Sequence, residues 1–179
     1  MTALAVSGDG EVVASGQSGD ARIVVWSSST QSVLGVLKSH TGAVSLLAFN
    51  GDGSRLASVD SNGGLCVWDT SDNSRIASAS LTTPALGLCW TTTGFVTCSE
   101  EGVLFWTLHQ GKFVSRSGLN GPSSEAYTGC VCLPSGDVLT TTGSGGFVVW
   151  RGRNYLRSVD EAHDRAIACL LYTSDAADE

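Results

Sequence analysis

The sequence predicts an all-β fold built from a repeated unit of four short strands. Five tryptophans occur in the 179 residues, and four of them close similar apolar stretches. These are Trp26, Trp68, Trp106 and Trp150, spaced 42, 38 and 44 residues apart. Hairpin-forming residues separate the short apolar runs, and no long segment combines helical spacing with a capping residue. A strand-rich repeat of about 40 residues therefore organises the chain.

The second unit shows the predicted strands most clearly, at residues 43–49, 55–59, 65–69 and 75–80. Its third run, LCVW, is almost continuously apolar, which is typical of a strand buried on both faces. Its fourth run, SRIASAS, is more polar, which suits an outer edge. Trp90, the fifth tryptophan, lies in an apolar run of the next unit and is predicted to pack in the core.

This unit, with a tryptophan closing the third of four strands, resembles the WD-repeat β-propeller pattern. In the second unit His40, Ser58 and Trp68 stand at the positions of that family's hydrogen-bonded relay. The family's relay also contains an aspartate in the tight turn. We expect Asn62 to replace it here and to bond more weakly, because an amide lacks the carboxylate charge. His163 follows His40 by three periods and is expected to open a fifth unit.

The fold class is thus predicted to be a WD-repeat β-propeller fragment, with about four four-stranded blades plus the first strand of a fifth. The predicted blades are residues 1–39, 40–81, 82–120 and 121–162, and the fifth begins at 163–168. Because a propeller closes only with its full ring of blades, the end blades are expected to expose apolar faces. Residues 169–179 resemble a translated sequencing adapter and are expected to be adapter-derived or disordered.

The composition excludes several classes of function. The formal net charge is −7, and this acidity argues against binding to nucleic acid or to an anionic membrane surface. The chain has no apolar run long enough to cross a membrane, and its start lacks the pattern of a secretory signal. We therefore expect neither a nucleic-acid nor a membrane partner.

The residues that could carry chemistry are expected to be structural. His40 and His163 are predicted to bond to neighbouring strands, and His109 to face solvent. Three aspartates recur in turns, where this residue favours the local backbone: Asp9, Asp52 and Asp137. Motifs for a nucleophile elbow, a phosphate loop or a dinucleotide fingerprint are absent. We expect no metal, no cofactor and no catalysis.

The cysteines are predicted to be small buried hydrophobes in a reducing compartment. Their spacing contains no zinc-binding pair. They are Cys66, Cys89, Cys98, Cys130, Cys132 and Cys169.

A more specific resemblance begins at residues 102–119, where GVLFWTL leads through a polar, basic stretch to GL. It continues with GGFVVW at 145–150 and an Ala-His pair at 162–163. With ASGQ at 14–17 and DSN at 60–62, this order resembles the first propeller of the echinoderm microtubule-associated protein-like family. The resemblance implies a non-catalytic scaffold that binds tubulin or microtubules and is located in the cytoplasm, on the microtubule cytoskeleton.

Two other classes stay open. Another WD-repeat interaction scaffold, such as a ciliary or flagellar component or a substrate adaptor, also fits the generic repeat. An enzyme of propeller fold would need a recurring cluster of polar residues, and the repeats show none. Small basic clusters at Lys112, Arg116, Arg151 and Arg153 are expected mainly to be solvated. The residues that contact a partner are not identified by the sequence.

Overall fold

The chain forms four antiparallel sheets of four strands each. The computed structural model describes residues 3–122, 125–160 and 162–167. Within each sheet the strands follow one another in chain order, so each sheet is a simple meander. The predicted all-β fold with four four-stranded units is confirmed.

The strand bounds place one sheet in each predicted blade. The first sheet contains β1 (Ala3–Val6), β2 (Val12–Gly16), β3 (Arg22–Ser27) and β4 (Val33–Lys38). The second contains β5 (Val44–Phe49), β6 (Arg55–Asp60), β7 (Gly64–Asp69) and β8 (Arg75–Ser80). The third contains β9 (Gly87–Trp90), β10 (Phe95–Ser99), β11 (Gly102–His109) and β12 (Lys112–Ser117). The fourth contains β13 (Tyr127–Cys132), β14 (Val138–Thr142), β15 (Phe147–Arg151) and β16 (Asn154–Val159).

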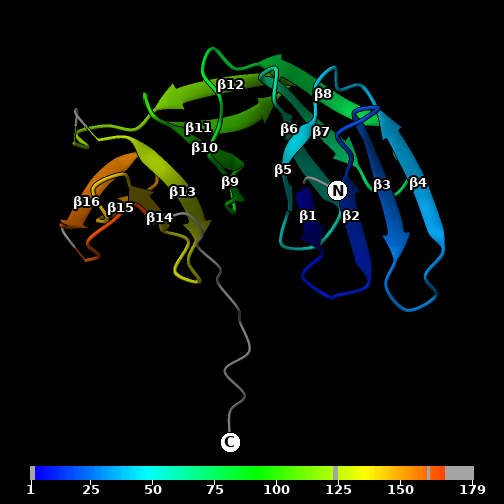
Figure 1. Cartoon of the computed structure of the whole chain (residues 1–179), viewed down its shortest axis with the longest axis horizontal. Helices are drawn as coiled ribbons and strands as arrows, with labels where there is room; N and C mark the ends of the chain where they lie inside the picture. The colour runs from blue at the N-terminus through cyan, green and yellow to red at the C-terminus, as the bar shows by residue number, and fades with distance from the viewer. Residues whose placement is uncertain (1–2, 123–124, 161, 168–179) are drawn as a thin grey trace, which may run out of the picture.

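The four sheets stand one after another along an arc, with first strands on the inner side and fourth strands on the outer side (Figure 1). Neighbouring sheets meet mainly through their first strands, since β1 contacts β5, β5 contacts β9 and β9 contacts β13. Because side chains alternate along a strand, every sheet has two faces. We call the side that carries the closing tryptophan the tryptophan face, and the other side the opposite face.

The core lies between the sheets and has three parts. Each part joins the opposite face of one sheet to the tryptophan face of the next. Between the first and second sheets, for example, Ile23 and Val25 pack against Leu56 and Trp68. Clusters of the same kind lie between the second and third sheets and between the third and fourth. The third strands of the second and fourth sheets, β7 and β15, are buried on both faces, as their continuous apolar runs predicted.

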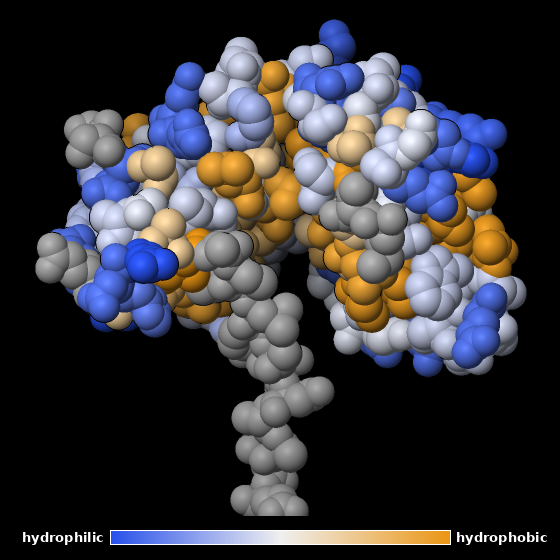
Figure 2. Space-filling model, viewed as in Figure 1, coloured by the Kyte–Doolittle hydropathy of each residue, from blue (hydrophilic) through white to orange (hydrophobic). Residues whose placement is uncertain are grey.

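The outer strands agree with the prediction in three sheets and differ in the first. The sequences RIASAS, KFVSRS and NYLRSV of β8, β12 and β16 carry polar side chains. In contrast β4 reads VLGVLK, and Val33, Leu34 and Val36 are exposed. Hydrophobic residues are visible over this first sheet (Figure 2).

The predicted fifth unit is described only from residue 162 to residue 167, and these residues form no strand. The backbone N–H of His163 donates to the Gly145 carbonyl, which holds this segment against the fourth sheet. Gly145 has φ +86°, and a Cβ there would lie 2.1 Å from the His163 carbonyl oxygen, so a glycine is required. The predicted adapter-derived or disordered tail, 169–179, lies outside the described residues.

The described part of the chain contains no helix that is long and apolar enough to span a bilayer.

Candidate functional site

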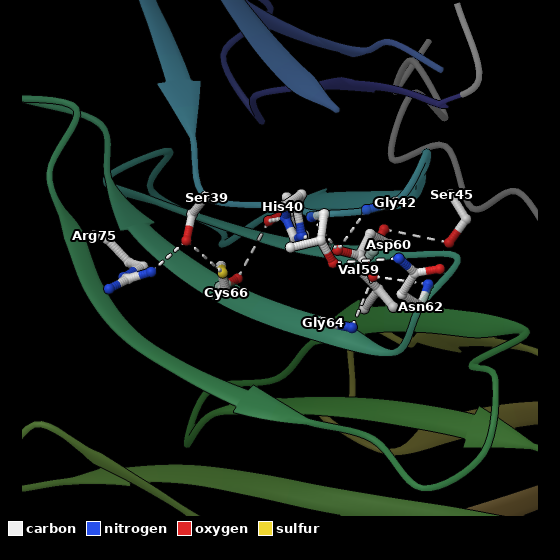
Figure 3. A network of polar contacts seen from close by, with 12 residues as sticks. Ser39, His40, Gly42, Ser45, Val59, Asp60, Asn62, Gly64, Cys66 and Arg75 are labelled. Carbon is white, nitrogen blue, oxygen red and sulfur yellow. Dashed lines mark hydrogen bonds and ion pairs between the residues drawn. The ribbon is translucent and has the colours of Figure 1, made fainter. Parts of the chain in front are cut away.

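The second sheet holds a buried chain of hydrogen bonds that begins at the closing tryptophan. Figure 3 shows the part of this network around His40 and Asp60. Trp68 Nε1 donates to Ser58 Oγ at 2.8 Å, and Ser58 Oγ lies 2.6 Å from His40 Nε2. His40 Nδ1 lies 3.0 Å from Asp60 Oδ2. The side chains of His40 and Asp60 are each 1% exposed. The predicted roles of His40, Ser58 and Trp68 in the relay agree with this geometry.

The expectation that Asn62 replaces the relay's acidic residue is wrong, because Asp60 supplies the carboxylate. Asp60 is the last residue of β6 and lies two residues after Ser58, so both side chains share one face. Asn62 is in the turn that follows, where its backbone N–H donates to Asp60 Oδ1 at 2.9 Å. Its side-chain amide donates to Thr41 Oγ1 instead.

The Asp60 carboxylate also organises two loops. Oδ2 accepts from the backbone N–H groups of Thr41 and Gly42, and Oδ1 accepts from those of Asn62 and Gly64. A Cβ on Gly64 would lie 2.6 Å from Oδ2, so a glycine is needed for this close approach. Asp60 therefore ties the entry of the blade to the turn between β6 and β7.

The pKa shifts of the pair favour neutral His40 beside ionised Asp60. Burial lowers the pKa of His40, and the hydrogen bond and charge of Asp60 oppose this only in part. Burial alone would raise the pKa of Asp60, but the N–H donors of Gly64, Thr41 and Gly42 and the bond to His40 bring it below its ordinary value. A neutral imidazole that donates from Nδ1 to Asp60 leaves Nε2 to accept from Ser58, consistent with both distances.

The lowered pKa of His40 predicts a pH dependence of folding. Between the folded pKa and the unfolded value of about 6.5, the unfolded chain binds more protons, so acid favours unfolding. The contribution of His40 is therefore complete above about pH 6.5 and declines as the pH falls through the folded pKa. We expect the urea midpoint to fall between pH 7 and pH 5. His40→Gln should flatten this dependence, whereas His109→Gln, at an exposed position, should leave it unchanged.

The third and fourth sheets keep part of the relay, which the sequence analysis missed. Trp106 Nε1 donates to Thr97 Oγ1 at 2.8 Å, and Trp150 Nε1 donates to Thr140 Oγ1 at 2.9 Å. Both threonines are buried and lie nine or ten residues before their tryptophan, as Ser58 does. Trp26 is half-buried, and its indole makes no hydrogen bond within the described part of the chain.

We predict that Thr97→Val lowers the free energy of unfolding by about 1–3 kcal/mol, because a buried indole N–H loses its acceptor. The shape of the side chain is nearly kept, so packing contributes little to the loss. Thr107→Val, at an exposed position of β11, is the matched control. Urea unfolding of the two variants measures the difference, and equal losses would contradict the prediction.

The arrangement of Asp60, His40 and Ser58 has the order of a hydrolase triad, yet it serves a structural role. Ser58 is fully buried, and its hydroxyl already accepts from Trp68. A substrate has no route to that oxygen, and catalysis requires the reacting atom to come within about 3.5 Å of the nucleophile. The relay therefore fixes the sheet and its loops.

The remaining predicted residues lie apart from one another. Asp9 and Asp52 cap turns by accepting from Ser7 and Ser54. Asp137 accepts two bonds from Arg151, both at 2.9 Å, so this arginine is paired although its side chain is 69% exposed. His163 is exposed, with its ring 6.0 Å from that of Phe147. These residues are spread over the first, second and fourth sheets and form no common site.

The structure describes five of the six cysteines that were predicted to be small buried hydrophobes. All five are free thiols; Cys66, Cys89, Cys98 and Cys130 are buried, and Cys132 is half-buried. Cys169 lies outside the described residues. No cluster that could hold a metal ion occurs within the described ranges.

Two hollows on the described part of the surface lie at opposite ends of the sheets. A groove of about 660 Å³ lies where loops of the third and fourth sheets meet. Glu100, Glu101 and Glu125 line it, together with Tyr127 and Trp150. The second hollow, of about 300 Å³, lies beside the first hairpin turns of the second and third sheets, where Trp90 and Phe95 contribute to the wall.

Comparisons with known proteins agree with this architecture. Residues 1–27 and 31–69 match the model of the family described as "WD domain, G-beta repeat". The β-propeller domain of Cps50 (Swd1) from Myceliophteria thermophila superposes with a TM-score of 0.86 at 21% identity. The superposition covers 96% of this chain and 58% of that one. The stretches 1–27 and 31–69 therefore match WD repeats, and the chain has the β-propeller fold.

Its curated relatives are much longer proteins. The chain is 34% identical over 119 residues to "Periodic tryptophan protein 2 homolog" of Schizosaccharomyces pombe, covering 64% of this chain and 14% of that protein. The Mus musculus protein of the same name is 34% identical over 110 residues, with 59% and 12% covered. "Autophagy-related protein 16" of Arabidopsis thaliana is 38% identical over 63 residues, with 35% and 12% covered. These names lend no support to the echinoderm microtubule-associated protein-like assignment.

Proposed function

We propose that the chain is a non-catalytic scaffold that binds partner proteins through the loops and grooves of its blades. The observation that carries this proposal is the sealed relay of His40, Ser58 and Asp60. The side chains that could take part in catalysis are engaged in buried hydrogen bonds that hold the sheet together. The outer surface is therefore the part of the molecule available for recognition. Stacked repeats of this kind present extended surfaces suited to protein partners.

The groove between the third and fourth sheets is the part of this surface that we expect to contact a partner. It is the larger of the two hollows described above, and its carboxylates favour a partner segment of positive charge. The acidic net charge of −7 strengthens this preference over a longer range.

A charge-reversal experiment tests the proposal. The variant Glu100→Lys/Glu101→Lys changes the groove, and Glu11→Lys/Asp160→Lys makes the same change of charge at exposed positions outside it. We expect at least one protein to co-purify with the wild-type chain and with the control, but not with the groove variant. That protein, once purified, should bind directly to the wild-type chain. An identical set of bound proteins for all three chains would contradict the role of the groove.

Tubulin is the partner implied by the resemblance of residues 102–119, and it stays a prediction, as does the cytoplasmic, microtubule-associated location. Microtubules carry an acidic surface, so this acidic chain would gain no long-range attraction. Binding would have to rest on local shape and specific pairs. Co-sedimentation with stabilised microtubules at low and moderate salt tests this partner, and absence of pelleting at both would refute it without affecting the scaffold proposal.

A further inference from the structure

Four of the five described cysteines lie at a single contact, the one between the third and fourth sheets. Cys89 is on β9 and Cys98 is on β10 of the third sheet, whereas Cys130 and Cys132 are on β13 of the fourth. The fifth, Cys66, lies between the first and second sheets. Within the described chain, thiols from two sheets therefore come together only at this contact.

Packing alone does not require thiols at these positions. Strand pairing makes Val59 the counterpart of Cys98 in the second sheet, and Leu88 the counterpart of Cys130 in the third. Both aliphatic residues belong to the core between the second and third sheets. The same kind of contact is thus built there without sulfur at either position.

Cys130 reaches two thiols of the third sheet across the contact. Cys98 pairs with Gly87, two residues before Cys89, so both thiols lie on the opposite face of that sheet. The Cys130 thiol is a hydrogen-bond partner of both. Gly87 allows this approach, because a Cβ there would lie 2.7 Å from Cys98 Sγ and 2.7 Å from the Cys130 nitrogen. The three thiols therefore lie together in the core.

Cys89 is the better placed partner for Cys130. The two residues lie on the inner strands β9 and β13, which contact each other directly. Cys89 is 8% exposed and Cys130 is 9% exposed, whereas Cys98 is 1% exposed. A small opening of the contact therefore admits an oxidant to this pair before it reaches Cys98.

We propose that Cys89 and Cys130 are a redox pair, which an oxidant of the peroxide class converts into a disulfide between the third and fourth sheets. The peroxide oxidises one thiol to a sulfenic acid and releases water as its O–O bond breaks. The second thiol attacks the sulfenic sulfur, the S–S bond forms, and a second water leaves. The two thiols thereby lose two electrons, which reduce one peroxide to two waters.

The surroundings of the pair make the first step slow and the second step fast. The neighbouring thiols and burial raise the pKa of Cys130, so its oxidation follows local opening of the contact. The sulfenic acid then has its partner thiol already beside it, which removes the need for a diffusional encounter. The disulfide stabilises the fold by constraining the unfolded chain, and a thiol reductant reverses it.

Peptide mapping of the full chain tests the link without any substitution. The chain is treated with hydrogen peroxide at low protein concentration, which favours links within one molecule. The remaining thiols are alkylated in urea, and the unreduced digest is analysed by mass spectrometry. We expect the peptides that contain Cys89 and Cys130 to be joined and to separate on reduction. A chain whose thiols stay unpaired, or one that joins Cys130 to another cysteine, would overturn the proposal.

Urea unfolding measures the effect of the link on stability. Oxidation should raise the urea midpoint of the wild-type chain, and a reductant should return it to its starting value. This shift should be lost in Cys89→Ala and Cys130→Ala and kept in Cys66→Ala, the matched control at a buried thiol between other sheets. Cys98→Ala should also keep the shift, which separates the pair from the third thiol. Circular dichroism checks that each variant keeps its β structure, and an equal shift in all four would contradict the link.

Discussion

Replacing Asp60 by alanine is expected to lower the free energy of unfolding by about 3–5 kcal/mol, because each buried donor left without its acceptor costs about 1–3 kcal/mol. The loss arises because His40 Nδ1 and the backbone N–H groups of Thr41, Asn62 and Gly64 lose their acceptor together. Water cannot replace it, since the side chains of Asp60 and His40 are 1% exposed.

Urea unfolding followed by circular dichroism measures this effect. Asp52→Ala is the matched control, because Asp52 caps the exposed turn before β6, where solvent can satisfy the Ser54 N–H. We expect a much smaller loss for the control. Asp60→Asn keeps one acceptor oxygen and should fall between the two, which separates the charge from the hydrogen bonds. Equal urea midpoints for Asp60→Ala and Asp52→Ala would show that the relay contributes no more to stability than the cap of an exposed turn.

The second large effect is expected for Trp68→Ala, at about 3–5 kcal/mol, the range for large aromatic truncations in a core. The substitution removes a buried ring from the cluster between the first and second sheets and leaves Ser58 without its indole donor. Trp26→Ala removes the same side chain from the face of the first sheet where it is only half-buried, so less than half of that loss is expected.

Comparing the two tryptophans in one chain keeps the residue type and the strand position constant. Thermal or urea unfolding of the two alanine variants measures the two losses. Trp68→Phe retains a ring but no N–H, and it should cost less than the alanine substitution. A Trp26 variant as unstable as the Trp68 variant would mean that this face is covered in solution.

The strands could be predicted from the sequence because patterning and turn residues agree in every unit. The predicted runs 55–59 and 65–69 correspond to Arg55–Asp60 and Gly64–Asp69. The predicted strand at 163–168 has no counterpart in residues 162–167. A strand needs a hydrogen-bonding neighbour, and the described chain supplies none beyond the fourth sheet. Local sequence therefore determined the hairpins, whereas the last unit depends on a partner strand.

The relay was predicted in part. Its histidine, serine and tryptophan could be recognised by spacing, but the acidic residue was assigned to the turn. Strict alternation along β6 could have identified Asp60, since Ser58 and Asp60 point to the same side. Thr97 and Thr140 were missed because the expected partner was a serine beside a histidine. Their distance from the tryptophan was the available clue.

The buried thiols have a consequence for studying motion in this molecule. Cys66 lies between the first two sheets, and Cys98 and Cys130 lie between the last two. Burial raises the pKa of Cys66, and neighbouring thiols together with burial raise the pKa of Cys130, so both are sluggish nucleophiles in the closed state. An alkylating reagent can reach these thiols only when two adjacent sheets separate transiently by local opening. The rates at which these native cysteines become labelled would compare how often the first and the last of the three contacts between sheets open.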